Sequence, residues 1–144
     1  MTCGGLLLAA NAYIDAHLPV SVPRGMNPDR VASERSGWMR EMQLNHDAHH
    51  GPGYWRLLLR ATIDETITHP NWTAGDLAGM TMPCLCVQGG RDGVNVPGQH
   101  AQTLARWLPN ADLWTPEMAG HSVHHELPDE FLARMLGLIA KCRT

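Results

Sequence analysis

The sequence predicts an α/β domain built on a parallel sheet, and two observations carry this prediction. From Met82 onward, short apolar runs alternate with amphipathic patterns of helical spacing, in the order strand, helix, strand, helix. Such an order with short loops is typical of parallel strands joined by right-handed crossovers. A further apolar run of strand length stands at residues 5–14, and helical patterns separate it from the others. We therefore expect about three parallel strands with flanking helices.

The composition agrees with a globular domain and excludes several classes of function. Hydrophobic residues make up 44% and charged residues 17% of the 144 residues, a balance that supports a folded core rather than disorder. The formal net charge of −3 gives no basic surface for nucleic acid or anionic lipid. No basic segment precedes the first apolar run, which is too short to span a bilayer. We therefore expect a cytoplasmic protein that binds neither nucleic acid nor membrane.

The first apolar run, residues 5–14, is continuous, as expected for a strand covered on both faces, although its Leu and Ala residues also suit a helix. We assign residues 1–15 to this strand of the sheet. Residues 16–26 contain Pro and Gly without clear periodicity, and we expect a connecting loop there.

Two helices are expected in the middle of the chain. Asn27-Pro28-Asp29 combines a side-chain acceptor, a proline at the first helical position and an acid near the positive helix end, so a helix should begin there and run to about His50. A second helical pattern covers residues 54–68. A capping-box pattern opens a single turn at Thr73. We expect residues 16–80 to form a small helical lid.

The carboxyl-terminal segment, residues 81–144, carries the clearest patterns. In its first apolar run two cysteines alternate with a leucine and a valine, as in a buried strand, and we interpret all four cysteines of the chain as reduced, small apolar residues. The expected elements are a strand at 82–88, a helix at 97–107, a strand at 111–115 and a helix at 128–142.

Each of the last two predicted strands is followed by a turn that carries one residue suited to proton transfer. Asp92 follows the first of these strands and His121 follows the second. Because the carboxyl ends of parallel strands line the same edge of a sheet, the carboxylate and the imidazole are expected to meet. A carboxylate orients the ring and stabilises the imidazolium that forms when the other ring nitrogen accepts a proton. We expect Gly90 and Gly93 to permit a tight turn that exposes Asp92, and Gly120 to bend the chain so that His121 projects inward.

The segment PCLCVQGGRDGVNVP, together with AGHSVHHELPDEF further on, resembles the carboxyl-terminal third of the α/β-hydrolase fold. In that family a strand and a loop with an aspartate and a later proline precede a Gly-His segment and a final amphipathic helix. GGLLLAANAYID resembles the sixth strand, and the helices before DLAGMTMPCL resemble the lid. The resemblance implies Asp92 as the triad acid and His121 as the triad base, with Gly120, Glu126 and Pro128 as matching surroundings.

One part of the family's pattern is missing. Full-length members carry the nucleophile on a Gly-x-Ser-x-Gly elbow before the sixth strand, and this sequence contains no such motif. Cys3, two residues before Gly5, is an alternative nucleophile, but no predicted strand precedes it, and a surface or packing role is our expectation. We expect a truncated chain that carries the acid and the base without the nucleophile, and that is inactive by itself.

Two further candidates involve polar side chains. Asp15, at the end of the first predicted strand, is an alternative acid for which we expect a structural loop role. His46 and His50 lie one helical turn apart, as in some zinc sites, with Asp47 between them. No third ligand is evident, so we expect no metal and no cofactor.

The resemblance to the α/β-hydrolase family implies a hydrolase that cleaves an ester or related bond of a small apolar substrate by a nucleophile–His–Asp mechanism. Trp38, Met42 and Trp55 are candidates for an apolar acyl or alkyl site, and plain packing is an equally good interpretation. The alternative function is a non-catalytic binding or assembly module with an apolar ligand site. The unpaired edge of the first strand invites self-association in either case.

Overall fold

The structure is a computed structural model that describes residues 4–142. The chain divides into two compact units. We call residues 1–13 and 70–144 the sheet unit and residues 14–69 the helical unit. Residues 70–80, which the sequence pattern assigned to the lid, lie in the sheet unit, because Leu77 packs into the core beneath the sheet.

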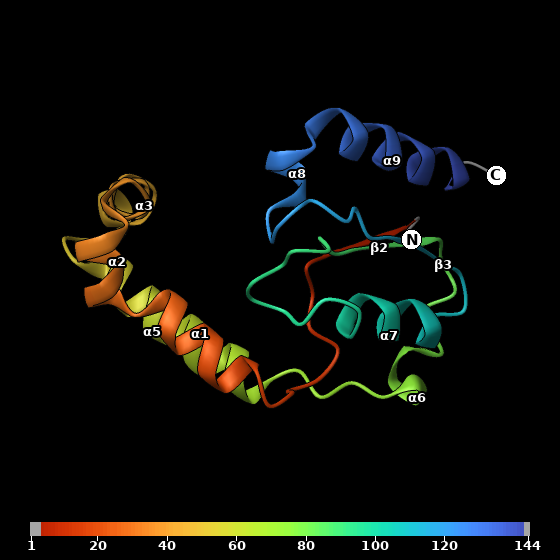
Figure 1. The fold of residues 1–144 in the computed structure, drawn as a ribbon, viewed down its shortest axis with the longest axis horizontal. Coiled ribbons are helices and arrows are strands. Elements are labelled where there is room, and N and C mark those ends of the chain that lie inside the picture. Colours follow the sequence, from red (N-terminus) through yellow and green to blue (C-terminus); the bar gives the residue numbers. More distant parts are fainter. Residues whose placement is uncertain (1–3, 143–144) are drawn as a thin grey trace. The chain divides into compact units, whose positions relative to one another are not determined.

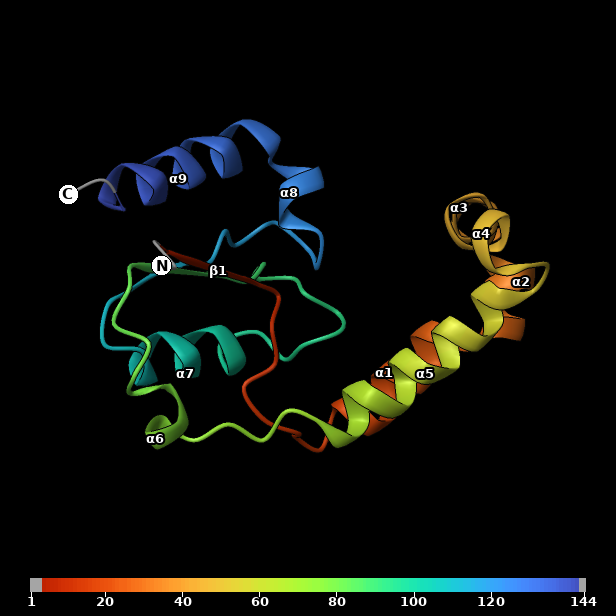
Figure 2. The same cartoon turned by 180° about the vertical axis from the view of Figure 1, so that it is seen from behind.

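The sheet unit contains three parallel strands in the order β1-β2-β3. Their bounds are Gly5–Leu8 for β1, Cys84–Val87 for β2 and Ala111–Trp114 for β3. Figures 1 and 2 show α7 (His100–Trp107) on one face of the sheet and α9 (Pro128–Lys141) on the other. The predicted fold class, three parallel strands with flanking helices, is confirmed.

The side chains of β2 divide between two apolar cores. Cys84 and Cys86 face α7, together with α6 (Ala74–Leu77), whereas Leu85 and Val87 face α9. This alternation is the one that the sequence predicted. Both cysteines are buried free thiols, and burial raises the pKa of Cys86 to about 12, so it acts as a small apolar residue.

The first strand is shorter than the apolar run at residues 5–14 indicated. β1 ends at Leu8, and Ala9 adopts the left-handed conformation with φ of 48°. The Ala9 N–H still donates to the Val87 carbonyl oxygen at 2.8 Å, so the residue remains tied to β2 while the chain turns away. An apolar composition therefore continued past the end of the strand.

The expectation of a loop at residues 16–26 was wrong. Helix α1 (Leu18–Met26) occupies this stretch, with a proline in its first turn where the missing N–H removes no hydrogen bond. Leu18 and Val22, one turn apart, are buried, and α1 lies along α5 (Tyr54–Thr68), as Figures 1 and 2 show. Prolines that were read as helix breakers are here compatible with a helix held by packing.

The single helix expected from residue 27 to residue 50 is broken. It begins as predicted, but Arg35 leaves the helical conformation, with φ of −132° and ψ of 51°. The pieces are α2 (Pro28–Glu34), α3 (Ser36–Met42), a π-helical turn (Gln43–Asp47) and α4 (Ala48–His50). The stop at Gly51, which has φ of 97°, was predicted correctly.

The remaining local signals were mostly accurate. The second predicted helix, residues 54–68, is α5, the capping box at Thr73 and Asp76 is present, and the last helix begins at Pro128. Helix α7 begins at His100, three residues after the position the proline suggested. Within residues 4–142, no helix combines the length and the apolar character needed to cross a bilayer.

The cap of α2 gives a first testable prediction. The Asn27 side-chain oxygen accepts hydrogen bonds from the N–H groups of Asp29 and Arg30, both at 3.0 Å. Asn27→Ala should lower the free energy of unfolding by about 1 kcal/mol because two N–H groups lose their acceptor. Thermal unfolding followed by circular dichroism measures this, and Asn45→Ala, at an exposed position of the π-helical turn, is the matched control. Equal losses in both variants would contradict the capping role.

Candidate active site

Two loops at the carboxyl ends of neighbouring strands form the candidate site. We call residues 88–97, after β2, the acid loop and residues 115–122, after β3, the histidine loop. Parallel pairing, with Val87 opposite Trp114, starts both loops at the same edge of the sheet. The structure brings the two predicted residues together: His121 Nδ1 lies 3.0 Å from Asp92 Oδ1 and 3.1 Å from Asp92 Oδ2.

The expectation of an exposed Asp92 was wrong, because its carboxylate is fully buried and accepts several hydrogen bonds. Its side chain is 0% exposed, and Oδ1 also accepts hydrogen bonds from the N–H groups of Val94 at 2.8 Å and Asn95 at 3.1 Å. Burial by itself raises the pKa of Asp92, but the hydrogen bonds from His121 and the two backbone N–H groups outweigh it, and the pKa is lowered. Asp92 is therefore held as a carboxylate near neutral pH.

Of the two nitrogens of the His121 ring, Nδ1 is hydrogen-bonded to Asp92 and Nε2 is not engaged in a hydrogen bond among residues 4–142. Hydrogen bonding to Asp92 raises the pKa of His121, against the opposing effect of partial burial. The side chain is 44% exposed, and Nε2 makes no hydrogen bond within the part of the chain that the structure describes. An imidazole with Nδ1 next to a carboxylate and with Nε2 not engaged in a hydrogen bond is the arrangement that a general base requires.

The histidine loop is held in turn by a carboxylate from the helix that follows it. Glu126, the last residue of α8 (Val123–Glu126), accepts a hydrogen bond from the Gly120 N–H at 2.8 Å. A Cβ atom on Gly120 would lie 3.0 Å from the Glu126 Oε1 atom, so glycine leaves room for this contact. The family resemblance implies both residues as surroundings of the histidine.

One glycine of the acid loop, Gly89, allows a backbone contact that the sequence pattern did not reveal. The predicted tight turn is present, because the Asp92 N–H donates to the Gly89 carbonyl oxygen at 3.2 Å. Neither Gly90 nor Gly93 has a positive φ, and a Cβ on Gly93 would meet no atom within 4 Å, so the turn itself does not require these two glycines. A Cβ on Gly89 would instead collide with the carbonyl oxygens of Ala119 and Gly120. Glycine at position 89 lets the two loops touch backbone to backbone.

Direct backbone hydrogen bonds join the two loops at this contact. The Gly90 N–H donates to the Pro116 carbonyl oxygen at 2.8 Å, and the Arg91 N–H donates to the Ala119 carbonyl oxygen at 2.9 Å. Asp92 and His121 therefore meet because their backbones are fastened together close by, and not through their side chains alone.

Two buried amides next to the acid were missed from the sequence. Gln88 and Asn95 are each 1% exposed. Gln88 Nε2 donates to the carbonyl oxygens of Asn95 at 3.3 Å and Val96 at 3.2 Å, and Asn95 Nδ2 donates to the Ala9 carbonyl oxygen at 2.7 Å. The only local indication of a role for Gln88 was its position as a polar residue at the end of an apolar run. The sequence around Asn95 gave no indication of a role.

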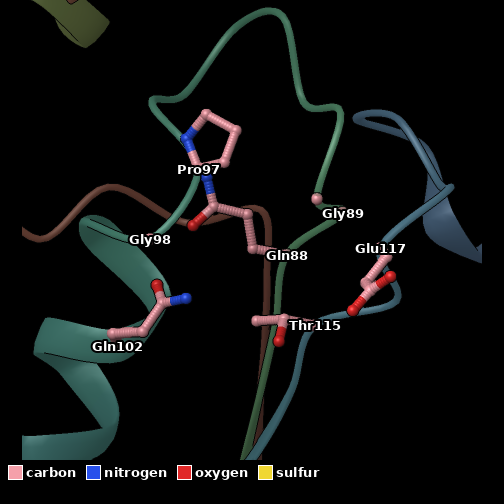
Figure 3. A pocket seen from close by; sticks show the side chains of 8 residues that line it. Gln88, Gly89, Pro97, Gly98, Gln102, Thr115 and Glu117 are labelled. Atoms are coloured by element: carbon pink, nitrogen blue, oxygen red, sulfur yellow. The ribbon is translucent and has the colours of Figure 1, made fainter.

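A small cavity of about 160 Å³ lies between the acid loop, the start of the histidine loop and the start of α7 (Figure 3). Neither Asp92 nor His121 lines it. The Gln102 Oε1 atom is buried without a hydrogen-bond partner among residues 4–142, a situation that a bound water resolves. The lining residues are Gln88, Gly89, Gly90, Pro97, Gly98, Gln102, Thr115 and Glu117.

The three apolar candidates lie together in the helical unit. Trp55 is 2% exposed and forms a core with Val31 and Leu59, and Trp38 and Met42 are half-buried against it. Packing within this unit accounts for Trp55. Their proposed contact with a substrate stays a prediction.

The polar alternatives have local structural partners. Asp15 Oδ1 accepts hydrogen bonds from the N–H groups of His17 and Leu18, both at 2.8 Å, at the start of α1. The Asp47 carboxylate accepts hydrogen bonds from the N–H groups of Gly53 and Trp55, at 2.9 and 3.0 Å. These bonds engage the carboxylate that stands where a zinc enzyme would have its general base.

No group of three His, Cys, Asp or Glu side chains within residues 4–142 is placed to hold a metal ion. His50, one of the two histidines considered as ligands, stacks its ring on Tyr54, with 4.3 Å between the ring centroids. Cys3, the alternative nucleophile, lies outside the described residues.

Comparison with known proteins identifies the fold to which this chain is similar. No family model and no curated protein matches the sequence. Among solved structures, the putative non-heme bromoperoxidase BpoC from Mycobacterium tuberculosis is similar over 99% of this chain and 59% of its own, with a TM-score of 0.68 and 18% identity. An α/β-hydrolase enzyme from a deep-sea metagenome library, MGS-M2, is similar over 94% of this chain and 55% of its own, with a TM-score of 0.64 and 17% identity. The chain has part of the α/β-hydrolase fold.

Other solved structures agree with this assignment. MenH from S. aureus is similar over 99% of this chain and 60% of its own, with a TM-score of 0.64 and 19% identity. The chain thus spans between 55% and 60% of the length of these three proteins. The predicted resemblance to part of the α/β-hydrolase fold is confirmed, and at these identities the likeness concerns the fold alone.

Proposed function

We propose that Asp92 and His121 are the acid and the base of a hydrolase that cleaves an ester or related bond in a small apolar substrate. One observation supports this most: a buried carboxylate lies 3.0 Å from Nδ1 of a histidine whose other ring nitrogen is open. The nucleophile is proposed to come from a polypeptide segment outside the 144 residues, since the sequence contains no nucleophile elbow. The α/β-hydrolase fold of the solved relatives agrees with this class of reaction.

The proposed chemistry follows from the two nitrogens of His121. Nε2 takes the proton of the nucleophile as the latter attacks the ester carbonyl carbon, and the Asp92 carboxylate stabilises the imidazolium. When the bond to the leaving group breaks, the imidazolium returns this proton to the leaving oxygen, and an acyl-enzyme remains. Water then attacks the acyl group with His121 again as base, which releases the acid and restores the nucleophile.

The chain by itself should not hydrolyse esters. We expect the 144-residue protein to release nitrophenol from a short-chain nitrophenyl ester no faster than its His121→Ala variant, because the sequence contains no nucleophile elbow. Absorbance of the released nitrophenolate measures both rates. Hydrolysis that survives Cys3→Ala but disappears in His121→Ala would show that the chain has a nucleophile of its own.

The alternative, a non-catalytic binding or assembly module, is favoured by one feature of the sheet. In the described part of the chain no strand pairs with the outer edge of β1, and Leu6 on this strand is 39% exposed. Such an edge accepts a strand from another chain, a second copy included. Sequencing the coding DNA upstream separates the two functions. A Gly-x-Ser-x-Gly motif there, in frame or frameshifted, supports the hydrolase, whereas its absence with a stable oligomer in sedimentation supports the module.

A further inference from the structure

We propose that Asn95 is a positioning residue, which aims the Asp92 carboxylate at His121 by fastening the acid loop to the end of β1. The inference rests on the proposed function in that it assigns Asn95 a role in the Asp92 and His121 pair. Nothing in the local sequence singles Asn95 out, and its importance follows from contacts with residues far away in the chain.

Asn95 is held at three points, each through a different polar group. Its side-chain Nδ2 donates to the Ala9 carbonyl oxygen at 2.7 Å, its carbonyl oxygen accepts from Gln88 Nε2 at 3.3 Å, and its N–H donates to Asp92 Oδ1 at 3.1 Å. The residue is 1% exposed, so water does not compete for these bonds. The backbone at position 95 is therefore fixed, and with it one donor that orients the carboxylate.

Ala9, to which the Asn95 side chain is bonded, is itself hydrogen-bonded to the sheet. The Ala9 N–H donates to the Val87 carbonyl oxygen at 2.8 Å, on the central strand of the sheet. The left-handed conformation of Ala9 turns the chain at this point. The route from the sheet to the acid runs from Val87 through Ala9 and Asn95 to Asp92, and from there to His121.

Gln88 braces the same loop from the side of α7. Its Oε1 atom accepts from the Ala101 N–H at 3.3 Å while its Nε2 atom donates to the Asn95 and Val96 carbonyl oxygens. The acid loop is thereby held against the first turn of α7. In Asn95→Ala the hydrogen bonds of Gln88 remain, but the side-chain bond to Ala9, directly after β1, is lost.

Loss of the Asn95 side chain should therefore leave the Asp92 carboxylate in the protein but make its orientation toward His121 less well defined. In Asn95→Ala we expect the pKa of His121 to fall toward its ordinary value by about half a pH unit or more, because a carboxylate that is poorly aimed stabilises the imidazolium less. The imidazole signals of His121 in a nuclear magnetic resonance titration of the 144-residue chain measure this pKa. A His121→Gln variant assigns the signals among the nine histidines.

A merely structural role would give a different result. Thr103→Val is the matched control, because Thr103 is a buried polar residue of α7, 6% exposed, that bonds to Arg106 and not to the acid loop. It should lower the free energy of unfolding and leave the pKa of His121 unchanged. An unchanged pKa of His121 in folded Asn95→Ala would overturn the positioning role.

Two further variants keep the outcome clear. If Asn95→Ala does not fold, Asn95→Ser, which keeps a shorter hydrogen-bond donor, replaces it. We expect a smaller fall in the pKa of His121 in this variant. An unchanged pKa of His121 would contradict the proposal. Asp92→Asn is the reference. If Asp92→Asn leaves the pKa of His121 unchanged, the proposed pair itself fails, whereas a fall in Asp92→Asn without one in the Asn95 variants overturns the positioning role alone.

Discussion

Gly89→Ala should be the most damaging small substitution near the site. A Cβ atom at position 89 would collide with the carbonyl oxygens of Ala119 and Gly120, and it would lie 2.7 Å from the carbonyl carbon of Ala119. These are backbone atoms of the histidine loop, so no side-chain rotation relieves the collision. We expect the free energy of unfolding to fall by about 3 kcal/mol, which equilibrium urea unfolding followed by tryptophan fluorescence measures.

The same substitution should also separate the proposed catalytic pair. If the loops move apart to admit the methyl group, His121 loses its short contact with Asp92, and its pKa should return toward the ordinary value. Gly93→Ala is the matched control in the same loop, because a Cβ there meets no atom within 4 Å. Its effect should stay within about 1 kcal/mol, in the stabilising direction. Similar stability of Gly89→Ala and Gly93→Ala would show that the two loops do not approach so closely.

The Asp92 and His121 pair should give stability a specific dependence on pH. Because the folded-state pKa of His121 is raised, its contribution is fully present below the ordinary histidine pKa and is lost as the pH rises through the raised value. Because the folded-state pKa of Asp92 is lowered, its contribution is present above the ordinary carboxyl pKa and is lost as the pH falls through the lowered value. The pair therefore stabilises the protein most between about pH 4 and pH 6.5.

Asp92→Asn should remove this contribution with little change of shape. The amide oxygen can still accept from the Val94 and Asn95 N–H groups, but the charge that attracts the imidazolium is gone. We expect a loss of about 1 to 2 kcal/mol near pH 5.5, limited because solvent reaches His121 and screens the pair. Urea unfolding between pH 4 and pH 8 measures the difference from the wild type.

A double-mutant cycle isolates the pair from the other titrating groups. The free energies of unfolding of Asp92→Asn, His121→Asn and the double variant, combined with that of the wild type, give the coupling between the two side chains. The coupling should be largest near pH 5.5 and should shrink above the raised pKa of His121. A coupling that does not vary with pH would mean that the contact is not an ion pair in the acidic range.

Local chemistry was enough to place most elements of the fold. Asn27 followed by Pro28 predicted the start of a helix, and Gly51 predicted its end. The alternation of cysteines with a leucine and a valine around Cys86 predicted a strand buried on both faces. Each of these signals works within a few residues, through a cap, a backbone preference or a side-chain period. The prediction of a loop around Pro19 and Pro23 was wrong, because the helix there depends on packing against α5 more than on the helix propensity of its residues.

The amino-acid sequence by itself determined which side chains are candidates: an aspartate and a histidine, each in the turn that follows an apolar run, in the pattern of a hydrolase fold. Only the tertiary structure decided how they meet. Gly89 is required by a backbone from a different loop, and Asn95 bonds to Ala9, 86 residues away. Contacts of this kind leave no local trace in a sequence, because the partner that explains each residue is brought near only when the strands pair.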